Sequence, residues 1–216
     1  MKHIYLTIDD GPSRRTSQLL DYLNARNIGA ILFCVGKNLI KRPNIATRAI
    51  REGFIIGNHS YDHSNFNKLN QAHARGQIEK TDKIINDLYA RSGIRRPAKY
   101  FRFPYGSKGR TPRAKQYNQV ILHDLEYFAP FHVPSLDWRW DVDVGDWHVS
   151  KKNRARKLRM AKKRLKALGP NSILDLHDQA PNLEMFVFQD LCQEVVHLGY
   201  TFHDNTRFHE QADKYF

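Results

Sequence analysis

Short apolar runs alternate with amphipathic segments along most of the 216 residues. Apolar runs bounded by glycine, proline or asparagine predict buried strands. They lie at 4–8, 30–35, 54–57, 99–103, 140–144, 172–176 and 200–202, and 120–122 is a further candidate. Apolar residues at helical spacing predict helices at 16–27, 43–53, 71–91 and 186–198, the first capped by Thr16. This alternation predicts an α/β fold with helices outside a parallel sheet or barrel.

The composition bounds the class of protein. The length fits one domain, and we find no internal repeat and no low-complexity linker. Cys34 and Cys192 both lie in apolar patterns, which predicts buried thiols rather than a disulfide framework. No apolar run reaches the length of a membrane-spanning helix. Since the first strand begins by residue 3 or 4, we see no signal segment. We expect a cytoplasmic location for the chain as written, or an extracellular or envelope location if the sequence is truncated.

The charge of the chain is strongly basic. It has 35 Lys and Arg residues against 22 Asp and Glu residues, a formal net charge of +13. Ten Lys or Arg residues and no acid fall within 151–166, where Leu158, Ala161, Leu165 and Leu168 recur at helical spacing. This pattern predicts an amphipathic basic helix. Its outer face is either simply solvated or a peripheral contact for an anionic surface.

Polar side chains follow five of the predicted strands at the point where each strand ends. The carboxyl ends of parallel strands meet at one rim, which is where α/β sheets and barrels bind their ligands. Polar clusters after separate strands are therefore expected in one site. The clusters are Asp9 with Asp10, His59 with His63, Arg102 with Tyr105, Asp146 with Trp147, and His177 with Asp178.

Two of these clusters suggest a metal site. His59 and His63 are four residues apart, so on a helical turn both imidazoles face the same way. Together with Asp9 or Asp10 they form a two-histidine, one-carboxylate set, which leaves coordination positions open as catalytic zinc sites do. The other aspartate is then free to act as a base. His177 comes from a distant strand and can supply a proton from the opposite side, as amide or ester hydrolysis requires.

The five clusters belong to five short motifs in a fixed order. They read TIDDGP at 7–12, HSYDH at 59–63, RFPYG at 102–106, DVGDW at 143–147 and LHD at 176–178. Their order and spacing resemble the polysaccharide deacetylases, the NodB-homology group also called carbohydrate esterase family 4. The resemblance implies a deformed (β/α) barrel, similar to a TIM barrel, as a single domain over 1–216.

The resemblance also implies roles for the metal and the acid–base residues. One divalent metal ion, usually Zn²⁺ with Co²⁺, Ni²⁺ or Mn²⁺ as alternatives, would be held by Asp10, His59 and His63. The remaining polar residues would do the proton transfers. Asp9 would be the general base held by Arg102, and His177 the general acid oriented by Asp146.

The family's substrate pocket maps onto four further positions. The backbone N–H of Tyr105, after Pro104, would stabilise the oxyanion. Trp147 and Leu176 would line the acetyl pocket.

The sequence departs from the family pattern at two positions. Ser64 stands where the family usually has proline, and Asp175 stands where it has an apolar residue of the acyl pocket. A carboxylate at 175 would weaken acetyl binding, favour a different acyl group or make a local contact. Region 111–140 is longer than usual, and its aromatic segment 127–131 fits either a loop over a binding groove or one packed on the core.

We therefore expect a metal-dependent hydrolase that removes N-acetyl groups from the amino sugars of a glycan, of the chitooligosaccharide or peptidoglycan type. One alternative is a deformylase or deacetylase of a lipid-linked amino sugar, or another hydrolase of non-peptide C–N bonds with this fold. An alternative from a different class is an inactive carbohydrate-binding module. Specific nucleic-acid binding is not expected, because no recognition motif accompanies the positive charge.

Overall fold

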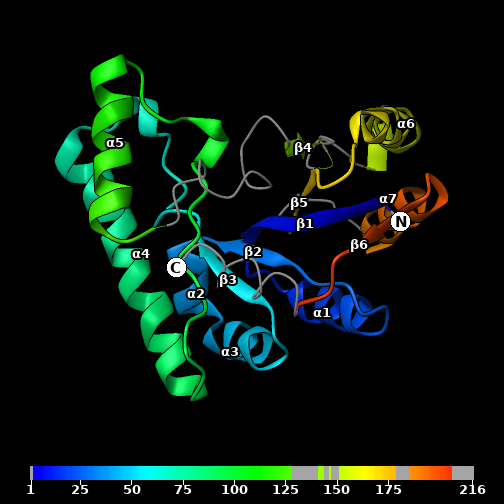
Figure 1. Cartoon of the computed structure of the whole chain (residues 1–216), viewed down its shortest axis with the longest axis horizontal. Helices are drawn as coiled ribbons and strands as arrows, with labels where there is room; N and C mark the ends of the chain where they lie inside the picture. Colours follow the sequence, from blue (N-terminus) through cyan, green and yellow to red (C-terminus); the bar gives the residue numbers. More distant parts are fainter. Residues whose placement is uncertain (1, 128–140, 144–145, 147–150, 179–184, 206–216) are drawn as a thin grey trace.

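The computed structural model describes residues 2–127, 141–143, 146, 151–178 and 185–205. These residues form one parallel sheet with helices around it (Figure 1). The order β3-β2-β1-β5-β4 runs through Ile55–Asn58, Ile31–Cys34, Lys2–Gly11, Ile173–His177 and Asp141–Asp143. Strand β6 (Tyr200–Phe202) pairs in parallel with the first residues of β1. The predicted α/β architecture is confirmed.

The register of β1 against β5 positions the site. Thr7 pairs with Asp175, and Asp9 pairs with His177. Since successive side chains of a strand point to opposite faces, these four residues share one face of the sheet. Leu176 and Ile8 pair on the other face, in the main apolar core. Two neighbouring strands therefore carry two layers of polar side chains towards the same space.

Seven α-helices are found in the described part of the chain. The main core packs apolar side chains of β1, β2 and β5 against α1, α3 and α7, and a smaller apolar cluster lies under α5. In Figure 1, α4 and α5 stand on one side of the sheet and α6 and α7 on the other. The helices are α1 (Thr16–Asn24), α2 (Gly36–Lys41), α3 (Pro43–Arg51), α4 (Gln71–Ser92), α5 (Pro112–Asp124), α6 (Arg154–Arg164) and α7 (Met185–His197). None of the helices described is both long and apolar enough to cross a membrane.

Residues 120–122, a candidate strand in the sequence, lie inside α5, so that prediction was wrong. The helix begins with strong local signals: the Thr111 hydroxyl accepts a hydrogen bond from the Ala114 N–H, and Pro112 follows it. Ile121 and Leu122 are then buried on the inner side of the helix. A short apolar run fits a buried helical face as well as a strand.

The strand predicted at 99–103 is reduced to an isolated bridge between Asn58 and Phe101. The Asn58 N–H donates to the Tyr100 carbonyl, and the Arg102 N–H donates to the Asn58 carbonyl. Pro104 follows directly. It has no N–H to extend the ladder, and the chain turns into the 3₁₀ helix η2 (Pro104–Gly106).

Two further details at helix starts differ from the prediction. Thr16 is the first residue of α1, and its hydroxyl donates to the Asp178 carboxylate instead of capping the helix. The short helix α2 was not predicted at all. It follows β2 directly and starts at Gly36.

In the aromatic segment 127–131, Tyr127 is buried, and the other residues lie outside the described part of the chain.

Candidate active site

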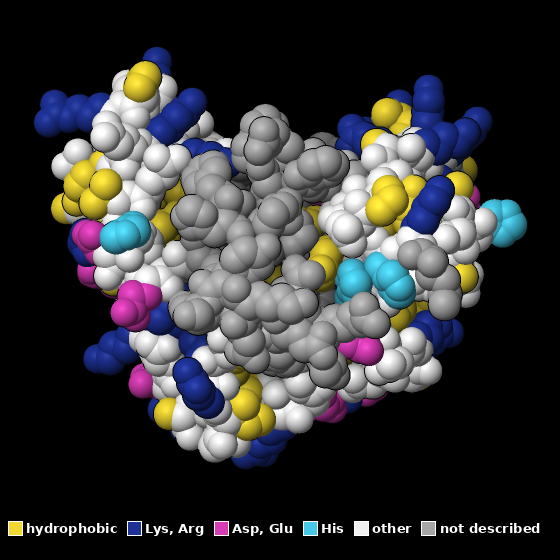
Figure 2. Space-filling view, in the orientation of Figure 1, with side chains coloured by type: hydrophobic (Ala, Val, Ile, Leu, Met, Phe, Trp, Pro, Cys, Tyr) yellow, Lys and Arg dark blue, Asp and Glu magenta, His cyan; other side chains and the backbone are white. Residues whose placement is uncertain are grey.

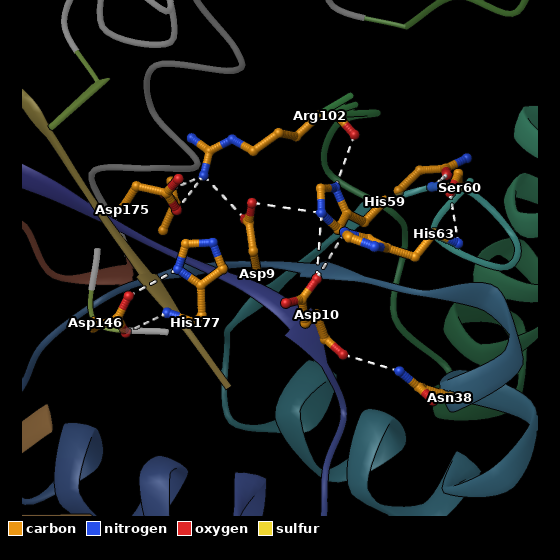
Figure 3. A network of polar contacts seen from close by, with 12 residues as sticks. Asp9, Asp10, Asn38, His59, Ser60, His63, Arg102, Asp146, Asp175 and His177 are labelled. Carbon is orange, nitrogen blue, oxygen red and sulfur yellow. Dashed lines mark hydrogen bonds and ion pairs between the residues drawn. The ribbon is translucent and has the colours of Figure 1, made fainter. Parts of the chain in front are cut away.

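Most of the polar side chains predicted at the strand ends converge in one place (Figure 3), whereas the Asp178 carboxylate binds Ser13 and Thr16. Asp9 and Asp10 come from the end of β1, and His177 comes from the end of β5. His59 follows β3, and Arg102 follows the bridge to Asn58. The fold thus brings together residues from four separate parts of the sequence.

Asp10, His59 and His63 form a cluster of potential metal ligands. The Asp10 Oδ1 atom lies 3.1 Å from His63 Nε2 and 3.5 Å from His59 Nε2. One ligand atom from each residue lies within 4.8 Å of the others. Two imidazole nitrogens and one carboxylate oxygen are the donor set of three-ligand zinc sites.

The protonation of His59 tests whether a cation fits there. Its Nδ1 lies 2.8 Å from the Arg102 carbonyl oxygen, which can only accept, so Nδ1 carries the hydrogen. Burial lowers the pKa of His59 to about 3 and outweighs the attraction of the Asp10 charge. His59 is therefore neutral, and its Nε2 lone pair faces Asp10 Oδ1 and, at 3.6 Å, Asp9 Oδ2. The His59 nitrogen and the carboxylate oxygens of Asp10 and Asp9 are thus three electron-pair donors that face one another, and this arrangement fits a bound cation.

The backbone at these ligands is constrained. Asp10, Ser60 and His63 have φ angles of 71°, 64° and 62°, a left-handed conformation that costs a side-chain-bearing residue roughly 1–3 kcal/mol. The Ser60 hydroxyl accepts a hydrogen bond from the His63 N–H at 3.1 Å. The Asn58 side chain accepts one from the Ser60 N–H at 2.9 Å. Neighbouring side chains thus hold the turn that carries both histidines.

A buried series of hydrogen bonds, not predicted from the sequence, supports this turn through Asn58. Asn58 Nδ2 donates to the Tyr127 hydroxyl at 2.6 Å, and that hydroxyl donates to the Asp82 carboxylate at 2.7 Å. Arg96 completes the chain at 2.5 Å from Asp82. Tyr127 is 69 residues from Asn58, so no local pattern links them. The one available signal was Asp82, an acid four residues from Ile78 and three from Ile85 in the helix predicted at 71–91.

Arg102 contacts Asp9, as the resemblance implied, but it contacts Asp175 as well. Its Nη1 atom lies 3.0 Å from Asp9 Oδ1, 2.5 Å from Asp175 Oδ1 and 2.8 Å from the Thr7 hydroxyl. The local contact that was one expectation for a carboxylate at position 175 is therefore present, and its partner is Arg102. Burial raises the pKa of Asp175 to about 7, because the Asp9 charge adds to burial and the Arg102 charge offsets only part of it.

His177 and Asp146 form a close ion pair on the other side of Asp9. His177 Nδ1 lies 2.9 Å from Asp146 Oδ1, and the His177 backbone N–H donates to Asp146 Oδ2 at 2.8 Å. Burial alone lowers the pKa of His177, but the hydrogen bond and charge of Asp146, with the charges of Asp175 and Asp9, raise it to about 11. The imidazole is therefore protonated at neutral pH, with Nδ1 engaged by Asp146.

The residues predicted around the substrate are only partly brought to this place. Tyr105 is exposed, and its ring centroid lies 4.6 Å from that of His63, while Pro104 is buried beside it. Leu176 is fully buried in the main apolar core, on the face opposite to His177, so its side chain is not brought to the site. Trp147 lies outside the described residues. Ser64 donates a hydrogen bond to the Asp62 side chain.

A parallel α/β fold with a two-histidine, one-carboxylate cluster at its strand ends is typical of metal-dependent hydrolases. The model of the polysaccharide deacetylase family matches residues 1–121, more than half of the chain. The chain therefore belongs to the polysaccharide deacetylase family.

Curated relatives and solved structures agree with this assignment. A peptidoglycan-N-acetylglucosamine deacetylase of Bacillus cereus is 35% identical over 145 residues, which are 67% of this chain and 46% of the relative. A chitooligosaccharide deacetylase of Azorhizobium caulinodans is 27% identical over 179 residues, 82% of this chain and 74% of the relative. The structure of the peptidoglycan deacetylase PdaC of Bacillus subtilis superimposes with a TM-score of 0.69 at 25% identity, covering 99% of this chain and 92% of that one. The (β/α)-barrel fold expected from the sequence is confirmed, although the chain spans only about half the length of the Bacillus cereus relative.

Proposed function

We propose that this chain is a metal-dependent hydrolase that removes N-acetyl groups from the amino sugars of a glycan, with 1–216 as one catalytic domain. The observation that carries the proposal is the different surroundings of its two adjacent carboxylates. Asp10 lies against His59 and His63. Asp9 instead contacts Arg102, and the β1–β5 register pairs it with His177 on the neighbouring strand. The named activities of the Bacillus cereus and Azorhizobium caulinodans relatives support a glycan of the peptidoglycan or chitooligosaccharide type.

Asp10, His59 and His63 would hold the divalent ion. Neutral imidazole nitrogens with one carboxylate oxygen favour Zn²⁺, and Co²⁺, Ni²⁺ and Mn²⁺ are the alternatives to test. When bound, such an ion supplies Lewis acidity toward the amide carbonyl and lowers the pKa of water.

Asp9 would be the general base. Its carboxylate would accept a proton from the attacking water while the water oxygen bonds to the acetyl carbon. The contact with Arg102 at 3.0 Å fixes the orientation of the carboxylate. The backbone N–H of Tyr105, in the turn next to His63, would donate to the oxyanion that develops on the carbonyl oxygen.

His177 would be the general acid. Since Asp146 engages Nδ1, the proton available for transfer is the one on Nε2. It would pass to the sugar nitrogen as the C–N bond breaks, because an amine leaves readily only when protonated. The products are acetate and a free amino sugar, which balances the one water consumed.

Acetate release from N-acetylglucosamine oligomers and from peptidoglycan, with added Zn²⁺ or Co²⁺, tests the proposal. Asp9→Asn and His177→Ala should each lower kcat by about 10²–10⁴, the usual size of a general acid–base contribution, with unchanged metal content and fold. Asp190→Asn removes a carboxylate that pairs with Lys162 outside the site, and it should keep full activity. Full activity in either site variant, or no acetate release by the parent protein on any acetylated glycan, would refute the assignment.

A further inference from the structure

The outer side of α6 carries an uncompensated positive surface. We define the basic face as Arg156, Arg159, Lys163 and Lys166, whose side chains are exposed on α6 and on the 3₁₀ turn η7 (Leu165–Ala167) that continues it. The first three are spaced three and four residues apart, so they lie along one side of the helix. Figure 2 shows Lys and Arg side chains gathered over the position of α6.

The inner side of the same helix is firmly packed. Ala161 and Leu165 are buried in the main core. Lys162 is bound to two acids of α7, at 2.9 Å from Asp190 and 3.1 Å from Glu194. The helix is therefore held in a fixed orientation, and the basic face has to point outward.

No ion pair joins the basic face to an acid anywhere in the described ranges, and 151–166 contains no acid at all. Like charges three and four residues apart on a helix repel one another and destabilise it. An ordinary solvated face would mix Glu with Lys and avoid this repulsion. Because no acid of the helix relieves this repulsion between cations, we expect an external anion bound to the basic face to relieve it.

Apolar side chains accompany the charges, and they distinguish between kinds of anionic partner. Met160 is 43% exposed on the outer side of α6, next to Arg156 at the edge of the basic face. Phe186 of α7 is 37% exposed beside the same helix, and its ring centroid lies 4.5 Å from the Arg154 guanidinium on the side of α6 that faces α7. Cationic side chains with apolar groups among them are typical of helices that lie in the interface of an anionic membrane.

We propose that the basic face binds the surface of an anionic lipid bilayer. Its four cationic side chains would contact lipid phosphates, and Met160 would enter the boundary between headgroups and acyl chains. The inference is independent of the proposed deacetylase activity, because none of these residues belongs to the candidate active site.

Sedimentation of the whole chain with vesicles tests the proposal. The vesicles contain either phosphatidylcholine alone or phosphatidylcholine with one third phosphatidylglycerol. The protein should bind only the anionic vesicles, and binding should fall steeply between ~0.05 and ~0.3 M salt as the Debye length shortens. The quadruple variant Arg156→Gln/Arg159→Gln/Lys163→Gln/Lys166→Gln should partition at least ~10-fold more weakly, since each cation near an anionic surface contributes to binding. Met160→Ser should weaken partitioning by roughly 2- to 5-fold at constant charge.

A matched variant separates a specific face from net charge. Lys68→Gln/Lys83→Gln/Arg91→Gln/Arg95→Gln removes the same number of exposed charges from the region of α4 and should keep parent-like binding. Equal losses in both quadruple variants, or no binding of the parent to anionic vesicles, would overturn the proposal. Stronger binding to a DNA duplex than to vesicles, lost in the α6 variant, would overturn it in favour of nucleic acid. Acetate release on a soluble oligomer should be unchanged in both variants, and neither variant should melt at a lower temperature than the parent, which keeps this test separate from that of the enzyme.

Discussion

The Asp175 carboxylate lies 2.5 Å from Arg102 Nη1, nearer than the Asp9 carboxylate at 3.0 Å from the same atom. One partly buried guanidinium thus contacts two buried acids. Asp175 is the residue at which this sequence departs from the apolar position of its family. In place of an apolar side chain, this chain has a carboxylate that shares the Arg102 guanidinium with Asp9, the proposed base.

Asp175→Asn should change the pH dependence of stability. The pKa of Asp175 is about 7 in the folded protein and near 3.8 in the unfolded chain, so the folded state holds this proton more tightly. The resulting contribution to stability is present below about pH 4 and is lost as the pH rises to about 7. The melting temperature of the variant should therefore rise relative to the parent between pH 4 and 8, by about 2–4 °C per kcal/mol in a chain of this size.

Thermal melts of both proteins across that pH range measure the effect. Asp190→Asn is the control for loss of a carboxylate outside the site, and its difference from the parent should not grow with pH in this way. Parallel curves for Asp175→Asn and the parent would contradict the prediction.

Removal of metal should destabilise the protein. A ligand bound at about 100 times its dissociation constant stabilises the folded state by roughly 2.7 kcal/mol. A chelator should therefore lower the melting temperature by about 5–10 °C, and readdition of Zn²⁺ should restore it. The Asp10→Asn protein should show little of this shift, because it lacks the carboxylate that faces both histidines. A chelator-insensitive parent would count against a resident metal.

Asp146→Asn should lower activity most at alkaline pH. In the parent, the pKa of His177 is about 11, so the imidazolium persists well above neutrality. Loss of the Asp146 charge should move the alkaline limb of kcat to lower pH, measured from about pH 6 to 10. The stabilisation that the His177 proton supplies is complete below about pH 6.5 and is lost toward pH 11, and the variant should show a flatter decline. A pH profile that falls uniformly without moving would indicate a merely structural role.

Tyr127→Phe should weaken metal binding from a distance. The change leaves the Asn58 and Asp82 side chains without their shared hydroxyl partner, at a cost of roughly 1–3 kcal/mol in stability. Because Asn58 supports the Ser60–His63 turn, affinity for Zn²⁺ should fall about 10-fold, by metal titration. Tyr200→Phe removes a comparable hydroxyl bond to the Leu168 carbonyl, and it should lower stability without any change in metal affinity.

The sequence predicts those parts of the fold that local patterns specify. Strands β1, β2, β3 and β5 are apolar runs ended by glycine or polar residues, and α4 is a long amphipathic segment. Residues 120–122 were misassigned because a three-residue apolar run does not distinguish a strand from a buried helical face. Residues 99–103 have strand composition, but Pro104 ends the ladder after a single bridge.

The candidate site was predictable as far as strand ends determine it. The approach of Asp10 to His59 and His63, and of His177 to Asp146, follows from residues placed at one rim. The contact between Arg102 and Asp175 did not follow, because it depends on which face of β5 points inward and how far the arginine reaches. The Asp82–Tyr127–Asn58 chain was equally hidden, since it joins residues that only tertiary packing brings together.

The left-handed backbone of the site limits how this protein can be made more robust. The described chain has seven non-glycine residues with positive φ, and Asp10, Ser60, His63 and Tyr105 account for four of them. Glycine would relieve the backbone strain at such positions, but here it would remove the side chains of the candidate site. Asn27 and Glu126 have the same geometry away from the site. Substitutions for heat stability are therefore best placed at those turns, whereas the candidate site has to retain its strained backbone conformations.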